Sequence, residues 1–315
     1  MSDTIPLGPG REFDVIRDLI RRWGDSARGI GDDAAILDVP AGSRLVASTD
    51  ATVENVHFRR EWLTPSEIGY RAATAALSDL AAMAATPIAM LVAMSVPERW
   101  RADLLGIAEG IGEASRACHA PITGGNLTNG TELSITVTVL GYAHHPLGRD
   151  GARVGDAIYV TGVLGGPGRA IAAWDAGRRP SAEDRSRFAR PTARIREALW
   201  LAERGATAAI DISDGLASDA AHLAAASSAD VCIEVDAIPT VHAASPVEAA
   251  RSGEEYELIV ASAAPIDEHA FAREFGVPLT RVGSVVARAG SVPTVHFRSR
   301  GAFVDLPAGH DHFSR

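Results

Sequence analysis

Four short aspartate-bearing segments are spread along a chain of 315 residues that contains no lysine. Their sequences are GIGDDAA at 29–35, STDATVENVHF at 48–58, LSDLAAM at 77–83 and DISDGL at 211–216. Clustered carboxylates that do not face basic partners usually hold divalent cations, and bound magnesium usually shares its shell with substrate phosphates. The missing lysine excludes the P-loop, which needs GxxxxGK, and the protein-kinase fold, which needs a lysine on a strand. Phosphoryl chemistry in this chain would therefore depend on metal ions and arginine.

The overall charge narrows the range of partners. The formal net charge is −10, and all 30 basic residues are arginines. A nucleic-acid surface needs a positive stripe that neutralises phosphates, so this balance predicts no nucleic-acid binding. A small anionic substrate remains compatible with it, because magnesium can screen the repulsion.

Cysteine usage and the terminal segment indicate a cytoplasmic protein. Cys118 and Cys232 are far apart and form no CxxC pair, so we interpret them as buried small hydrophobes in a reducing compartment. Residues 1–14 lack the charged and apolar regions of a signal peptide. The most apolar stretch, 72–96, is interrupted by an aspartate and a proline, which predicts a helix, a turn and a strand instead of a membrane span.

Hydrophobic periodicity predicts two consecutive α/β units. The first contains helices at 12–23, 67–83 and 103–118 and strands at 44–49, 90–96 and 133–141. A glycine-rich, charged segment at 144–156 is the best boundary, so we predict domains at 1–147 and 148–315. The second contains strands at 157–161, 208–212, 231–235, 258–262 and 281–286, and helices at 169–176, 192–204 and 216–226. We expect 176–189 to be an exposed connection.

The first three aspartate segments each allow a metal-binding and a structural interpretation. Asp50, at the predicted end of a strand, follows Ser48 and Thr49, and three oxygen ligands in a row suit magnesium, although they also suit a plain turn. Asp79 lies in an apolar helical stretch where an unpartnered carboxylate is costly, unless a helix begins at Ser78 and places it in the first turn. In Asp32–Asp33, one side chain could bind a metal while the other caps the next turn.

The fourth segment joins a predicted strand to a predicted helix. Alternation along the strand end points Asp211 and Ser213 the same way, and Asp214 begins the turn that Gly215 permits. Capping of the helix by Ser213 or Asp214 is the structural alternative.

Glycine-containing segments add weaker signals. GGN at 124–126 precedes a strand, and paired glycines let a backbone approach a phosphate closely. The glycines at 162–168 fail the GxGxxG spacing, which favours a tight turn over a dinucleotide site. GEEYE at 253–257 is a carboxylate-rich turn before a strand, and neither it nor His57 is specific alone.

Taken together, the segments resemble the thiamine-monophosphate kinase family of the aminoimidazole ribonucleotide synthetase-like superfamily. The resemblance runs in order through GIGDDAAIL, STDATVENVHF, GYRAATAALSDLAAMAATP, GGNLTNG, LGY, DGARVGDAIYVTG, DISDGLASD, SGEEYEL and the terminal HDHF. It implies transfer of a phosphoryl group from ATP to thiamine monophosphate, giving thiamine diphosphate. It also implies a two-domain α/β fold, with an N-terminal domain that forms a dimeric β-barrel, a C-terminal α/β domain, and an active site between them.

The resemblance also implies roles for individual residues. Magnesium ions would be bound by Asp33, Ser48, Thr49, Asp50, Asp79, Asp211 and Asp214. Gly125, Asn126, Arg149 and Ser213 would contact ATP, and His57 and Glu254 would contact thiamine monophosphate. We predict Asp50, Asp79 and Asp214 to be the catalytic residues, acting by direct in-line transfer between phosphates held by several magnesium ions.

The chain departs from the family pattern at four positions. Asn126 stands where the family has aspartate, Ala76 where it has asparagine, Ala84 where it has glycine, and Pro307 where an aromatic residue would stack on the thiamine ring. These departures leave two alternatives open: an enzyme of the same superfamily with another acceptor, and an ATP-binding homologue that has lost turnover.

Overall fold

The computed structural model describes residues 11–30 and 34–305 and divides the chain into two compact units. Unit 1 consists of Met1–Leu80 and Ala85–His145, and unit 2 of Ala81–Ala84 and Pro146–Arg315. Among the described residues, no helix has both the length and the apolar character that a membrane span requires.

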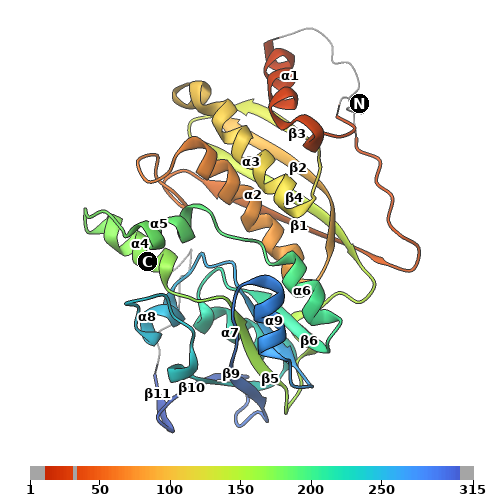
Figure 1. Ribbon diagram of the computed structural model, residues 1–315. Helices are drawn as coiled ribbons and strands as arrows, with labels where there is room; N and C mark the ends of the chain where they lie inside the picture. The colour runs from red at the N-terminus through yellow and green to blue at the C-terminus, as the bar shows by residue number, and fades with distance from the viewer. Residues whose placement is uncertain (1–10, 31–33, 306–315) are drawn as a thin grey trace. The chain divides into compact units, whose positions relative to one another are not determined.

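Unit 1 is a four-stranded sheet with helices α2 (Pro65–Ala82) and α3 (Leu104–Cys118) on one face (Figure 1). The strand order is β1-β4-β2-β3, and only the β2–β3 pair is parallel. The strands are β1 (Arg44–Val53), β2 (Thr86–Val96), β3 (Ile122–Asn129) and β4 (Ser134–Ala143), and a further helix, α1 (Arg11–Trp23), precedes them in the chain. Helices α2 and α3 pack closely, because a Cβ at Gly69 would lie 1.9 Å from the Ile107 carbonyl oxygen and one at Gly110 1.8 Å from that of Ser66.

The other face of this sheet carries small, apolar and threonine side chains. Leu45 is 55% exposed, and Ala47 and Thr49, which follow it at alternate positions of β1, are exposed as well. A groove of about 870 Å³ runs along this face, lined mainly by apolar side chains of the sheet and of α1, among them Phe13, Trp23, Leu91, Ala93 and Leu140. The single chain contributes an open sheet, and its described residues form no closed barrel.

Unit 2 is built around a seven-stranded mixed sheet with the order β11-β10-β7-β9-β5-β8-β6. Its strands are β5 (Ala157–Thr161), β6 (Ala206–Asp211), β7 (Asp230–Glu234), β8 (Leu258–Ser262), β9 (Leu279–Val286), β10 (Val295–Ser299) and β11 (Ala302–Val304). Its helices are α4 (Gly166–Asp175), α5 (Ala182–Ala189), α6 (Ile195–Ala202), α7 (Leu216–Ser227), α8 (Pro246–Arg251) and α9 (Glu268–Phe275). Apolar side chains of α7 and α8 form one continuous core with those of the sheet, and Trp200 of α6 stacks edge-on against Phe271 and Phe275 of α9.

Most predicted elements are confirmed, four elements were not predicted (α8, α9, β10 and β11), and three further segments differ for local reasons. Strand β1 does not end at Asp50 but continues to Val53, because β4 pairs with it along its whole length. The predicted connection 176–189 contains helix α5, whose first turn is capped by Ser181 accepting from the Asp184 N–H. The segment 124–126 is not a loop before a strand but part of the edge strand β3.

Candidate functional site

The second and third aspartate segments, which both belong to unit 1, meet where strand β1 faces helix α2. Ser48 Oγ donates a hydrogen bond of 2.6 Å to Asp79 Oδ2, although the residues are 31 positions apart. Asp50 lies two residues after Ser48 in β1, so its side chain projects from the same face of the sheet. Both aspartates are partly buried, so their oxygens can be reached from solvent. The structure thus brings Ser48, Asp50 and Asp79 to one face.

Thr49 belongs to the opposite face of the same strand. Its hydroxyl lies 3.0 Å from the hydroxyl of Thr138, the residue directly opposite it on β4. The expected row of three side-chain ligands is therefore split by strand alternation, because β1 continues past Asp50 instead of ending there. A contribution from Thr49 to a metal on the Ser48 face would have to come from its backbone.

Asp79 occupies the last turn of α2 and not the first turn of a helix beginning at Ser78. The predicted helix at 67–83 is confirmed, and the alternative start at Ser78 is excluded: α2 begins at Pro65, after Thr64 and Glu67 form reciprocal bonds at its N-terminus. The hydroxyl of Ser48 supplies the polar contact that a carboxylate needs in this apolar setting.

His57 lies in a turn tied back onto the end of β1. Its ring nitrogen Nδ1 accepts a hydrogen bond from the Val53 N–H at 3.1 Å. The backbone N–H of His57 donates to the Val53 carbonyl at 2.9 Å. In a neutral ring this places the proton on Nε2. The turn is anchored by Glu54, which accepts from Arg99 Nη2 at 2.6 Å and from the Leu133 N–H at 3.2 Å.

Gly125 and Asn126 are exposed residues of β3 that line the groove on the open sheet face. A Cβ at Gly125 would lie 1.9 Å from the Val92 carbonyl oxygen of the neighbouring strand. Close packing against β2 is therefore a structural reason for this glycine, beside the phosphate contact that the sequence suggested.

In unit 2, the DISDG segment forms the turn between β6 and α7. Asp211, 4% exposed, is the last residue of β6, and Gly215 precedes α7 with φ +107°. Neither Ser213 nor Asp214 caps the helix through its side chain: the N-cap position is Gly215, with no side-chain cap hydrogen bond. Helix capping, the alternative role for Ser213 and Asp214, is therefore excluded.

Asp219, which the sequence reasoning missed, organises this turn. Its Oδ2 accepts from the backbone N–H groups of Ser213 at 3.0 Å and Asp214 at 3.1 Å. Burial, followed by the negative charges of Asp211 and Asp214, raises the pKa of Asp219 to about 8. Ligand atoms of Asp214, Asp219 and His222 lie within 4.8 Å of one another. The only sequence signal was the last letter of DISDGLASD, which carried no assigned role.

The GEEYE segment is joined to the DISDG turn through the backbone. The N–H of Glu254 donates to the Ser213 carbonyl at 2.7 Å, and the N–H groups of Glu255 and Tyr256 both donate to that of Ile212. A Cβ at Gly253 would lie only 2.7 Å from the Ser213 carbonyl oxygen, so glycine is required for this approach. The structure thus joins two segments about 40 residues apart in sequence, a contact that the sequence did not predict.

Arg149 lies at the far end of α7 from Asp214. Its carbonyl accepts from Ser227 Oγ at 2.7 Å, and Ser227 ends the helix that begins just after Gly215. A helix of 12 residues is roughly 18 Å long. Arg149 therefore lies too far along the helix to grip a phosphate that Asp214 holds.

The roles of all these residues stay predictions, and two of the positions are not described by the structure. Asp33 and Pro307 lie outside the described residues. Ser48, Asp50 and Asp79 belong to unit 1, whereas Asp211 and Asp214 belong to unit 2. The convergence of both sets on one magnesium cluster therefore stays a prediction.

Comparison with known proteins places both units in one family. Residues 31–143 match the model of the AIR synthase related protein, N-terminal domain, and residues 153–296 match that of the C-terminal domain. A thiamine-monophosphate kinase from Rhodopirellula baltica is 37% identical over 295 residues, covering 87% of this chain and 88% of the relative.

Solved structures agree with the sequence comparison. The thiamine-monophosphate kinase of Stenotrophomonas maltophilia superposes with a TM-score of 0.81 at 32% identity, covering 94% of this chain and 98% of that one. The structure of AaThiL complexed with AMPPCP and TMP superposes with a TM-score of 0.74 at 27% identity, covering 96% and 97%.

Proposed function

The chain belongs to the AIR synthase-related family and, within it, to the thiamine-monophosphate kinases, and we propose that magnesium held by its aspartate segments drives the reaction. It is an ATP-dependent kinase that makes thiamine diphosphate from thiamine monophosphate. The observation that carries the metal proposal is the convergence of oxygen-bearing side chains within each unit: the hydroxyl of Ser48 with the carboxylate of Asp79 in unit 1, and the carboxylates of Asp214 and Asp219 in unit 2.

The residues present fit magnesium by their chemistry. The described candidate ligands are hydroxyl and carboxylate oxygens, which are the donors that magnesium prefers. We assign Ser48, Asp50 and Asp79 to the metal ligands of unit 1, with Thr49 acting through its backbone, and Asp211 and Asp214 to those of unit 2. Asp33 completes the proposed set. The bound ions would neutralise charge on the phosphates and bridge them to the protein.

The remaining assignments concern the two substrates. Gly125, Asn126 and Ser213 are proposed to contact the phosphate end of ATP, and Arg149 the part of the nucleotide remote from Asp214. His57 and Glu254 are proposed to contact thiamine monophosphate. His57 carries its proton on Nε2 when neutral, so it can donate to a phosphate oxygen, whereas the Glu254 carboxylate suits the positively charged ring of thiamine.

The transfer step requires little covalent work by the protein. An oxygen of the thiamine phosphate attacks the γ-phosphorus of ATP in line, the bond from that phosphorus to the bridging oxygen breaks, and ADP leaves. The side chains named above hold the two phosphates in position, and no residue becomes phosphorylated. Isolation of a phosphorylated form of the protein on the reaction path would overturn this mechanism.

A second copy of the chain is the proposed partner for the open face of the unit 1 sheet. That face exposes Leu45, and its groove is lined by Leu91, Ala93 and Leu140. Exposed apolar patches of this kind mark association sites on soluble domains. Pairing of two such sheets would give the dimeric barrel that the resemblance implies. Sedimentation analysis tests it: the wild type should be a dimer and Leu45→Asp largely a monomer.

A single-turnover assay tests the function most directly. Enzyme in excess is mixed with ATP, magnesium and thiamine monophosphate, and thiamine diphosphate is measured. Product formation supports the kinase. ATP binding without product would support loss of turnover through Asn126 and Pro307, and ATP use with another acceptor alone would support a sister activity.

A further inference from the structure

The GEEYE turn holds an unfavourable backbone conformation. Glu254 has φ +63° and Tyr256 has φ +55°, which lie in the left-handed region that residues bearing a Cβ rarely adopt. Such conformations persist only where the surroundings determine them, and they occur most often at functional sites. The contacts that hold this turn therefore indicate what it is built to present.

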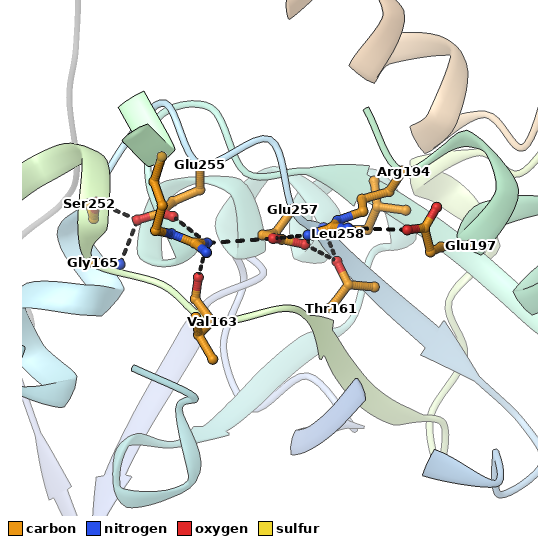
Figure 2. Close-up of polar contacts among 10 residues, drawn as sticks. Thr161, Val163, Gly165, Arg194, Glu197, Ser252, Glu255, Glu257 and Leu258 are labelled. Carbon is orange, nitrogen blue, oxygen red and sulfur yellow. Dashed lines mark hydrogen bonds and ion pairs between the residues drawn. The ribbon is translucent and has the colours of Figure 1, made fainter. Parts of the chain in front are cut away.

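Alternate residues of the turn are directed into the interior of unit 2. Figure 2 shows Glu255 between Ser252 and Gly165, and Glu257 between Thr161 and Arg194. Glu255 Oε1 accepts from the Gly165 N–H and from Ser252 Oγ, both at 2.5 Å. The side chain of Glu255 is 0% exposed and that of Glu257 is 3% exposed.

An arginine pair completes this network. Arg194 grips Glu257 with two hydrogen bonds, from Nη2 at 2.6 Å and from Nε at 2.8 Å, and donates from Nη1 to Glu197 at 3.1 Å. Arg187 Nη2 lies 3.6 Å from Glu255 Oε2 and 3.5 Å from Glu257 Oε1, so it joins the two glutamates. Bidentate pairing fixes orientation as well as charge, so these contacts lock the turn in place.

The intervening residues are thereby directed to each other. Tyr256 is 7% exposed, and its hydroxyl donates to Glu254 Oε2 at 2.6 Å. Glu254 is itself only partly buried. A rigid, buried phenol thus aims a carboxylate that solvent and ligands can reach.

We propose that Tyr256 is a positioning residue for substrate: its hydroxyl orients the Glu254 carboxylate toward the thiamine moiety, on a turn locked by the buried glutamate–arginine network. This inference rests on the proposed function, in which Glu254 contacts thiamine monophosphate. Tyr256 acts through Glu254 and does not touch the reacting phosphates. Its effect therefore falls on binding of one substrate.

The experiment compares Tyr256→Phe with Tyr159→Phe in steady-state assays on the full-length protein. Tyr256→Phe removes one hydroxyl without changing the ring, and it should raise KM for thiamine monophosphate about tenfold, since a hydrogen bond to a charged group is lost. The kcat and the KM for ATP should stay within about twofold. Tyr159 is the matched control, because its hydroxyl accepts from the Ile266 N–H elsewhere in unit 2. That variant should leave all three constants unchanged.

A double-mutant cycle separates positioning from a general structural role. Glu254→Gln alone should also raise KM for thiamine monophosphate. Added to Glu254→Gln, the Tyr256→Phe change should raise KM less than twofold further, because its effect passes through the carboxylate.

The outcomes are distinct. If the wild type forms no thiamine diphosphate, the proposed function fails before Tyr256 is tested. If the wild type turns over but Tyr256→Phe leaves KM for thiamine monophosphate unchanged, the inference is wrong. It is also wrong if the effects of Tyr256→Phe and Glu254→Gln on this KM multiply independently. A lower kcat together with a similar rise in KM for both substrates would point to a distorted fold, and this result would also overturn the inference.

Discussion

The turn that carries His57 in unit 1 and the turn that carries Glu254 in unit 2 are held by different means. Each has a buried glutamate paired with an arginine, Glu54 with Arg99 and Glu257 with Arg194, both at 2.6 Å. The side chain of Arg99 is 47% exposed, whereas that of Arg194 is 10% exposed.

The backbone explains this difference. The His57 turn is closed by ordinary backbone hydrogen bonds to Val53, and its left-handed residue, Asn55, is of a type that tolerates that conformation. The Glu254 turn places glutamate and tyrosine in the same region. An unfavourable turn requires a buried support with several bonds, whereas a favourable one does not.

The largest expected effect is one in which the two units should not differ, because the proposed metal ligands should matter equally in both. Asp79→Asn in unit 1 and Asp214→Asn in unit 2 should each lower kcat about 100-fold or more, since each removes a charge that we propose to hold magnesium. The measurement is kcat at saturating magnesium, with thermal unfolding to verify the fold. Asp14→Asn, at a side chain 68% exposed, is the control and should be silent. A loss confined to one unit would contradict a shared cluster.

The stability of the two turns tests the comparison directly. Arg194→Met removes the bidentate partner of the buried Glu257, leaves it with the weaker contact to Arg187 at 3.5 Å, and should lower the free energy of unfolding by about 3 kcal/mol. Arg99→Met should cost only about 1 kcal/mol, because water can reach Glu54 from the half-exposed arginine side. Urea unfolding of each variant against the wild type gives both values. Equal costs would show that burial of the pair does not distinguish the turns.

Glu255 makes the support in unit 2 dependent on pH. Burial, outweighing the hydrogen bond from Ser252 and the positive charge of Arg187, raises the pKa of Glu255 to about 7 from an ordinary value of 4.5. The folded state therefore binds the proton more tightly than the unfolded state, so this contribution to stability is complete below about pH 4.5 and is lost as pH rises to about 7. Glu255→Gln keeps an acceptor but cannot ionise. Its stability relative to the wild type should rise by about 3 kcal/mol between pH 4.5 and 8 in urea unfolding.

Glu248 provides a control of opposite sign. Hydrogen bonds from the backbone and hydroxyl of Ser245 lower its pKa, so its contribution is present above the ordinary value and is lost as pH falls. Glu248→Gln should therefore lose stability relative to the wild type as pH rises. Parallel trends for the two variants would rule out Glu255 as the source of the pH dependence.

Asn126 tests the contribution of unit 1 to ligand binding, because it is an exposed strand residue that we propose to contact a ligand. Asn126→Asp restores the carboxylate of the family pattern and should lower the magnesium concentration for half-maximal activity severalfold, about 1 kcal/mol of binding. A magnesium titration at fixed ATP measures this, and Asn129→Asp on the same strand is the control. An unchanged titration for Asn126→Asp would exclude a metal contact there.

The smallest expected effect concerns the end of α2, which carries Asp79. Ala84 has φ +47° at the position where the family has glycine, and its N–H donates to the Ala81 carbonyl at 2.9 Å. Glycine adopts this conformation without a Cβ penalty, so Ala84→Gly should stabilise the protein by about 0.5–1 kcal/mol in thermal unfolding. Ala82→Gly, at the last residue of the helix, should instead destabilise the protein, by up to about 1 kcal/mol.

The sequence predicted many of the elements because burial follows their hydrophobic period. Strand β8 was predicted with its bounds, and α2 and α7 within about two residues, since each has a strong apolar pattern. Helix α5 and strand β3 escaped prediction because their composition is polar or glycine-rich, and pairing with neighbours decides them. Among site residues, the Ser48–Asp79 contact joins segments that the sequence could only propose separately.

The sequence by itself determined the chemistry of this protein: carboxylate segments without lysine, in an order that identifies a family of phosphate-transferring enzymes. Only the tertiary structure decided that Thr49 faces away from Ser48, that Asp219 folds back onto Ser213 and Asp214, and that Tyr256 aims Glu254. The physical reason is that residue type and spacing encode charge, ligand chemistry and local periodicity. Hydrogen bonds between distant segments depend on strand register and on where each loop closes, which the whole packed chain determines.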